Sequence, residues 1–173
     1  SLRAERLAAV VLPADGQYLG DWQRGAEVAG NGRGLQSSDD PAQPNGGNCY
    51  ACHQLAPDEV AYGTLGPSLT GYGARGQSEA MLQYTWTKLW DTHAYNLCSH
   101  MPRFGAQGIL TEQQLKDVMA YLLDPASPVN QAADGPADGR ATCVTPSAGG
   151  PESPPLAGTW KFQSPPDIRP VSA

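Results

Sequence analysis

The chain has 173 residues, enough for one domain of ordinary size, with 40% hydrophobic residues and a formal net charge of −6 at pH 7. This acidic balance argues against nucleic acid or an anionic membrane surface as a partner, because both are negatively charged. No apolar run approaches the roughly 20 residues of a membrane-spanning helix. Ten of the 16 prolines lie between Pro125 and Pro170, so we expect the core to come from about the first 125 residues.

Residues 1–20 are predicted to form an N-terminal arm. Within it, residues 2–12 make a short amphipathic stretch that stops at Pro13. Its apolar side chains are those of Leu2, Leu7, Val11 and Leu12. We expect this arm to pack on the domain or on a partner protein. No signal peptide is recognisable, and we interpret Ser1 as the start of a processed or trimmed chain.

A domain is predicted over residues 21–130. Its first helix begins with Asp21 as N-cap and runs to about Gly30. One face of this helix carries small residues that allow another helix to cross closely. The residues on this face are Trp22, Gly25, Ala26 and Ala29. Residues 31–48 are rich in Gly, Asn, Ser, Asp and Pro, and we expect them to form a polar loop.

The motif Cys49-Tyr50-Ala51-Cys52-His53 is typical of covalent attachment of a c-type haem. Each cysteine can form a thioether with one vinyl group of the porphyrin, and the adjacent histidine can then reach the iron as its proximal ligand. Because a covalent haem handles electrons, the motif indicates redox chemistry with one haem c as the cofactor. This kind of attachment also implies export, and we expect the bacterial periplasm.

A Cys-x-x-Cys pair has three other interpretations: half of a zinc site, a redox dithiol or a structural disulfide. Zinc needs four ligands, but the remaining cysteines are isolated, and His93 and His100 do not have the spacing of a zinc finger. A thioredoxin-like dithiol follows a strand, and the segments on either side of the motif do not predict one. Haem attachment is therefore the interpretation that we prefer.

The iron of a six-coordinate electron-transfer haem needs a second ligand opposite His53, and Met101 is the candidate. A Met/His pair raises the reduction potential relative to stronger donors. Met101 lies 48 residues after His53, and Pro102 disfavours helical geometry at the residue before it, so Met101 is expected in a loop. His100 is the alternative ligand, or else a solvent-facing neighbour, while His93 is expected on a helix surface.

Two more helices are predicted. Ser78 caps the first, and a Thr111–Gln114 capping box begins the second, which runs from about 112 to 123. We expect the last helix to cross the Asp21 helix near Gly25, with Tyr121 at the contact. Residues with helical spacing, Met81 and Met119 among them, are expected in the core. They are Met81, Leu82, Thr85, Trp86 and Leu89 in the first helix, and Leu115, Val118, Met119 and Leu122 in the second.

The placement of His53 and Met101 between an N-terminal and a C-terminal helix resembles a class I cytochrome c, which implies an all-α fold. More narrowly, residues 46–130 resemble SoxX, the small monohaem subunit of the SoxAX cytochrome of bacterial thiosulfate oxidation. The segments that carry this resemblance are Gly47 to His53, Gly66 to Leu69, Tyr95 to Gly105, Gly108 to Gln114, and Leu123 to Asn130.

The resemblance implies a role for each site residue. Cys49 and Cys52 would hold the haem, His53 and Met101 would ligate the iron, and the Pro67 carbonyl would accept a hydrogen bond from the other ring nitrogen of His53. The chain would relay electrons to a soluble cytochrome after a larger SoxA-like subunit conjugates thiosulfate oxidatively to a cysteine of a SoxYZ-like carrier. With both axial positions filled, we expect no catalytic residue here, only an electron-transfer subunit of an L-cysteine S-thiosulfotransferase.

The remaining cysteines and the tail lie beyond what the resemblance explains. In an exported protein, Cys98 and Cys143 are expected to form a disulfide, and a bond from one of them to a partner subunit is the alternative. Residues 131–173 are predicted to be an extended Pro-rich tail, which either wraps a larger subunit through Trp160 and Phe162 or is a disordered appendage. A free-standing periplasmic electron carrier is the alternative function for the chain.

Overall fold

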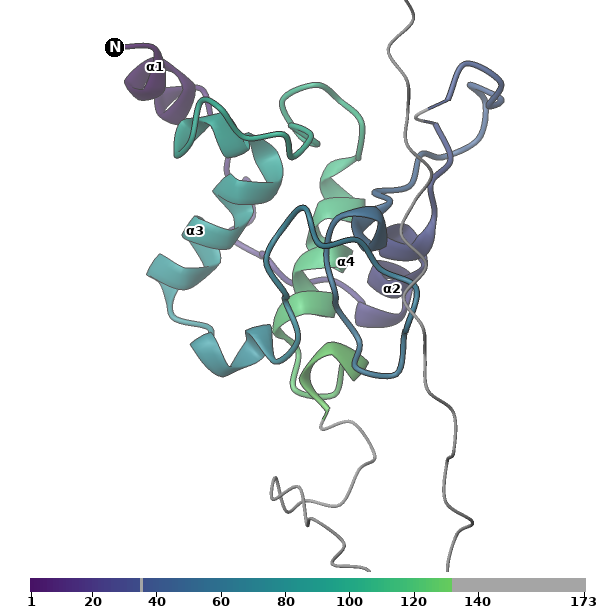
Figure 1. Cartoon of the computed structure of the whole chain (residues 1–173). Coiled ribbons are helices and arrows are strands. Elements are labelled where there is room, and N and C mark those ends of the chain that lie inside the picture. Colours follow the sequence, from purple (N-terminus) through teal and green to yellow (C-terminus); the bar gives the residue numbers. More distant parts are fainter. Residues whose placement is uncertain (35, 132–173) are drawn as a thin grey trace, which may run out of the picture. The chain divides into compact units, whose positions relative to one another are not determined.

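The computed structural model describes residues 1–34 and 36–131, and within them the fold is all-α, as expected (Figure 1). Four α-helices are present in this part of the chain: α1 (Leu2–Ala8), α2 (Trp22–Gly30), α3 (Glu79–Trp90) and α4 (Glu112–Leu123). Short 3-10 turns lie between and after them: η1 (Cys49–Ala51), η2 (Tyr72–Arg75), η3 (Thr92–Ala94) and η4 (Pro128–Asn130). None of the helices in the described ranges is both long and apolar enough to cross a bilayer.

The three longer helices begin at the caps that the sequence predicts. The Asp21 side chain accepts hydrogen bonds from the backbone N–H groups of the first turn of α2, and Ser78 does the same for α3. Thr111 and Gln114 form a complete capping box at the start of α4. Each cap satisfies N–H groups that have no partner within the helix.

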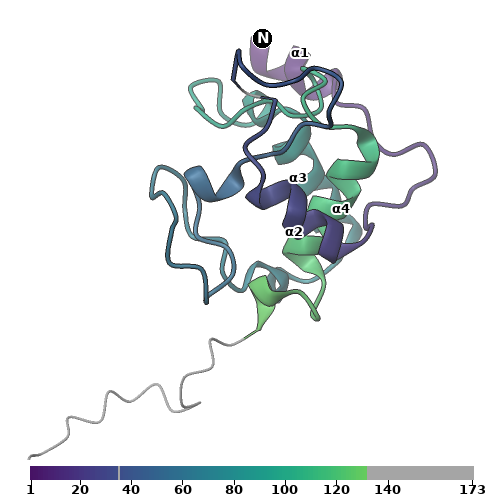
Figure 2. The ribbon, with the colours of Figure 1, turned by 90° about the vertical axis from the view of Figure 1, so that its right-hand side faces the viewer.

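Helices α2 and α4 cross at Gly25, as predicted, and the two helices lie side by side in both views (Figures 1 and 2). A Cβ atom at Gly25 would collide with the carbonyl oxygen of Asp117 and would lie 2.8 Å from the Cβ of Tyr121. The absence of a side chain at Gly25 therefore allows the two backbones to approach closely, with Tyr121 at the contact.

A buried carboxylate, that of Asp117, joins the two crossing helices. It accepts hydrogen bonds from Arg24 Nε at 2.9 Å, from Arg24 Nη2 at 3.0 Å and from the backbone N–H of Asp21 at 2.8 Å. The Gln113 side chain donates a further bond at 2.9 Å. Burial by itself would raise the pKa of Asp117, but these hydrogen bonds outweigh burial and lower that pKa.

We expect the Asp117→Asn variant to lose about 1–2 kcal/mol of unfolding free energy at pH 7, a modest value because Arg24 is more than half exposed. A carboxyl group whose pKa is lowered by folding stabilises the protein above its unfolded pKa of about 3.9, and this stability is lost as the pH falls through the lower folded pKa. Urea unfolding at pH 7 and at pH 3 should show a smaller difference between variant and wild type at the lower pH. An equal difference at both pH values would contradict this assignment.

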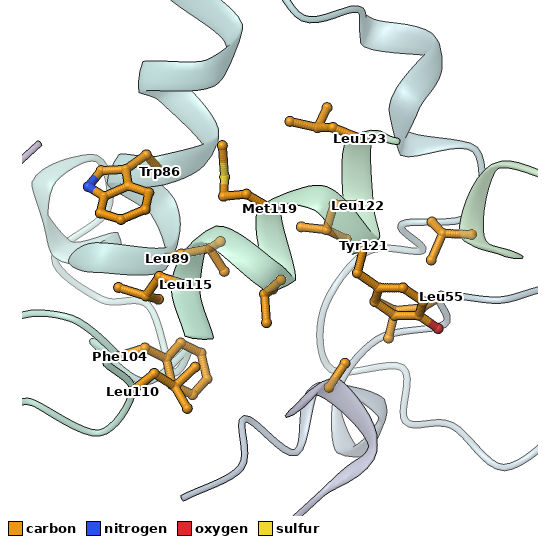
Figure 3. Packing of buried hydrophobic residues seen from close by; sticks show 13 residues of the cluster. Leu55, Trp86, Leu89, Phe104, Leu110, Leu115, Met119, Tyr121, Leu122 and Leu123 are labelled. Carbon is orange, nitrogen blue, oxygen red and sulfur yellow. The ribbon is translucent and has the colours of Figure 1, made fainter. Parts of the chain in front are cut away.

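The core is built around α4, whose residues 115–123 are all buried (Figure 3). Trp86 and Leu89 of α3 and Phe104 and Leu110 of the following loop join this cluster. Met119 is fully buried, as predicted. Met81 is only half-buried, and its sulfur lies 3.7 Å from the Thr85 hydroxyl, so it sits at the margin of the core rather than inside it.

The N-terminal arm packs on the domain through apolar contacts of Val10, Tyr18 and Leu19 and through polar contacts. The indole N–H of Trp86 donates to the carbonyl of Val11 at 2.8 Å, and Arg6 lies 3.8 Å from the carboxylate of Asp91. No residue of α1 is buried. The apolar side chains that the sequence suggested for packing remain 42–56% exposed; they are Leu2, Leu7, Val11 and Leu12.

Candidate functional site

The haem motif lies in a single tight turn. Asn48 precedes η1 with a left-handed φ of 48°, a conformation that Asn tolerates better than most residues. The N–H groups of Cys52 and His53 both donate to the carbonyl of Cys49, at 3.1 and 2.9 Å. This geometry keeps Cys49, Cys52 and His53 on one short, internally bonded segment. Burial raises the pKa of the Cys49 thiol to about 12, so this sulfur stays protonated near neutral pH.

The turn is attached to the helical scaffold at two places. The N–H of Gly47 donates to the carbonyl of Val28 in α2 at 2.8 Å. The hydroxyl of Tyr50, inside the motif, lies 2.8 Å from the hydroxyl of Tyr121 in α4, and it accepts the N–H of Ala56 at 3.2 Å. Burial is the main cause of a strongly raised pKa at Tyr121, so the Tyr121 hydroxyl remains neutral. The sequence predicted Tyr121 at the helix crossing but not this second contact.

The His53 ring lies against the loop that contains Gly66 and Pro67. Its Nδ1 atom is 2.7 Å from the Pro67 carbonyl oxygen, which can only accept, so Nδ1 carries the proton. A Cβ at Gly66 would collide with the ring and would lie 2.5 Å from Nδ1 and 2.7 Å from Nε2. The contact implied by the resemblance is therefore present, and it leaves the lone pair of Nε2 available for a metal.

Met101 comes from a separate segment, the loop between η3 and α4. Its side chain is half-buried against the core cluster, and its backbone N–H donates to the Ser99 hydroxyl at 3.2 Å. His100, the alternative ligand, is exposed. His93 was expected on a helix surface, but it is half-buried in η3, and its Nε2 lies 3.1 Å from the carbonyl oxygen of Ser99.

These residues fit a covalent haem better than a bare metal ion. Within residues 1–34 and 36–131 no group of three or more His, Cys, Asp or Glu side chains is placed to hold an ion. Two neighbouring cysteines and a histidine with a fixed tautomer and a free Nε2 are the donor set that a c-type haem uses.

The cytochrome c family matches residues 23–124, which is more than half of the chain, so this chain belongs to the cytochrome c family. Its fold is that of a class I cytochrome c, its cofactor is covalently bound haem c, and its role is electron transfer.

An uncharacterized lipoprotein of Aquifex aeolicus (strain VF5) is 38% identical over 130 residues, which are 73% of this chain and 61% of the relative. The chain thus spans about three fifths of that relative's length. A chain in the crystal structure of SoxXA from P. pantotrophus is 24% identical, with a TM-score of 0.44 and a coverage of 66% of this chain and 93% of that chain.

Several predictions from the sequence concern residues outside the described part. Cys98 is exposed on the loop before Met101, but its predicted partner Cys143 lies outside the described residues. The same holds for Trp160 and Phe162, and for all of the predicted tail except Gln131. The pairing of Cys98 and the wrapping of a partner by the tail remain predictions.

Proposed function

We propose that this chain is the electron-transfer subunit of a SoxAX-type complex and carries a single haem c. The observation that carries this proposal is the resemblance of residues 46–130 to SoxX, above all in the Met101 loop and in the ending from Leu123 to Asn130. The sequence contains a single Cys-x-x-Cys-His motif, which supports one haem.

The SoxX-like ending has a structural role that supports the resemblance. The Asn130 side-chain amide donates to the carbonyls of Leu122 and Asp124, at 3.0 and 2.8 Å, and so closes the C-terminus of α4. Its carbonyl oxygen accepts the N–H of Gly73 at 2.7 Å. The ending thereby ties α4 to the segment that follows Pro67, whose carbonyl orients His53.

Each site residue has a separate role in this proposal. Cys49 and Cys52 would form the thioether links and His53 and Met101 would ligate the iron, while the Pro67 carbonyl orients the ring of His53. Bound haem c supplies a reversible one-electron iron couple. With His53 and Met101 as its ligands, the iron would have no open position for thiosulfate, so the haem would supply electron transfer and not the sulfur chemistry.

In this proposal, the sulfur chemistry belongs to a larger SoxA-like subunit, which conjugates thiosulfate to a cysteine of a SoxYZ-like carrier. The two electrons released there pass through this chain to a soluble cytochrome acceptor. The periplasm is the proposed compartment, because haem c is attached outside the cytoplasm and the Aquifex aeolicus relative is named a lipoprotein.

Co-purification tests the proposed complex. When this chain is co-expressed with the candidate larger subunit, we expect a second, larger haem protein to purify with it. The pair should then reduce a soluble cytochrome in the presence of thiosulfate and the carrier protein, and reactions without the carrier serve as the control. A stable, separate monomer after co-expression would instead favour the free-standing carrier.

A further inference from the structure

Ser99, two residues before Met101, bonds the Met101 loop to η3. The Ser99 hydroxyl accepts hydrogen bonds from the Met101 N–H at 3.2 Å and from the Thr92 hydroxyl at 3.3 Å. The Ser99 carbonyl accepts a bond from His93 Nε2 at 3.1 Å. Ser99 therefore joins the backbone of Met101 directly to two neighbouring residues of η3.

A buried carboxylate, that of Asp91, anchors η3. Asp91, which is 3% exposed, accepts the N–H of His93 at 3.0 Å through Oδ1. Its Oδ2 lies 3.7 Å from Arg103 Nη1 and 3.8 Å from Arg6 Nη1. Arg103 is two residues after Met101, so Asp91 contacts the loop directly after the methionine and, through His93 and Ser99, indirectly before it. Arg6 belongs to α1, which packs beside η3 (Figure 1).

We propose that Ser99 and Asp91 are positioning residues for Met101, which hold its loop in the arrangement that presents the thioether to the iron. This inference rests on the proposed axial role of Met101. The sequence pattern assigned no role to either residue.

The physical basis is the competition between a tethered ligand and a free one. A loop that is held in place gives its methionine a high effective concentration at the iron, because the entropy of closing the loop is already lost on folding. Removing a tether lets the loop sample open arrangements, and an external ligand then competes more successfully. Each lost hydrogen bond should raise the affinity for the external ligand by a factor that corresponds to the net free energy of that bond.

The experiment is a titration of the oxidised, haem-loaded full-length chain with free imidazole, followed by the loss of the near-infrared sulfur-to-iron band. For Ser99→Ala we expect imidazole to bind about fivefold more tightly than in the wild type. Ser99→Thr keeps a hydroxyl and should stay within about twofold of the wild type. Asp91→Asn should bind imidazole at least about fivefold more tightly, because it removes the charge that faces Arg103 and weakens the support of His93.

Asp117→Asn is the matched control. Asp117 is also a buried carboxylate that faces arginine and accepts a backbone N–H, but it lies at the crossing of α2 and α4. The Asp117→Asn variant should have a lower thermal midpoint of unfolding, and its affinity for imidazole should stay within about twofold of the wild type. If Asp91→Asn does not fold, the Ser99→Ala and Ser99→Thr pair decides the matter, because Ser99 is half-exposed.

One result would contradict the positioning role of Ser99, and a different result would contradict iron ligation by Met101. If Ser99→Ala binds imidazole as the wild type does while the wild type shows the sulfur band, the positioning role is wrong and the ligation by Met101 stands. If the wild type lacks the sulfur band, the proposed ligation itself fails.

Discussion

Replacing Met101 with alanine is expected to abolish the near-infrared sulfur-to-iron band and to lower the reduction potential on the order of 0.1 V. A neutral thioether favours ferrous iron, and the water that would replace it favours the ferric state. Absorption spectra of the oxidised protein and a potentiometric titration measure the two effects.

The other two methionines provide matched controls for this prediction. Met119 is buried in the core and Met81 is half-buried at its margin, so Met119→Leu and Met81→Leu should change stability slightly and leave the band intact. Loss of the band in either control but not in Met101→Ala would contradict the assignment. If Met101→Ala keeps a six-coordinate low-spin spectrum that His100→Ala loses, the alternative ligand His100 is correct.

A valine at Gly25 is expected to lower the free energy of unfolding by about 3 kcal/mol or more, a large part of the stability of a small domain. Even a single Cβ there would collide with the backbone of Asp117, and two more methyl groups would force α2 and α4 apart. Because α2 also accepts the N–H of Gly47 next to the haem motif, the variant should retain less covalent haem per chain. Urea unfolding followed by circular dichroism measures the first effect, and the haem-to-protein absorbance ratio measures the second.

Gly30 is the matched control, because it is the last residue of the same helix and a Cβ there meets no atom within 4 Å. Gly30→Ala should be neutral or stabilising by about 0.5 kcal/mol, since alanine loses less conformational freedom in a helix than glycine does. If Gly25→Val were no more destabilised than Gly30→Ala, the close crossing of α2 and α4 would be wrong.

The sequence was sufficient to predict a structural feature wherever the residues that form it are close together along the chain. The caps at Asp21, Ser78 and Thr111 were predictable because each cap bonds to N–H groups two or three residues later. The haem motif was recognisable for the same reason, since its chemistry is contained in five consecutive residues. The crossing at Gly25 could be predicted because a face of small residues on one helix requires a close partner, and α4 offered the strongest apolar pattern.

The sequence alone therefore determined the helices, the haem motif and the candidate iron ligands, and tertiary structure decided how they are held. Tyr50 and Tyr121 are 71 residues apart, and Arg24 and Asp117 are 93 apart, yet each pair makes direct hydrogen bonds. The contacts of Asp91 with Arg6 and Arg103 could not be predicted from the sequence either. Periodicity shows which face of a helix is apolar, but the partner of a buried polar group depends on where distant segments meet, and only the folded chain specifies that.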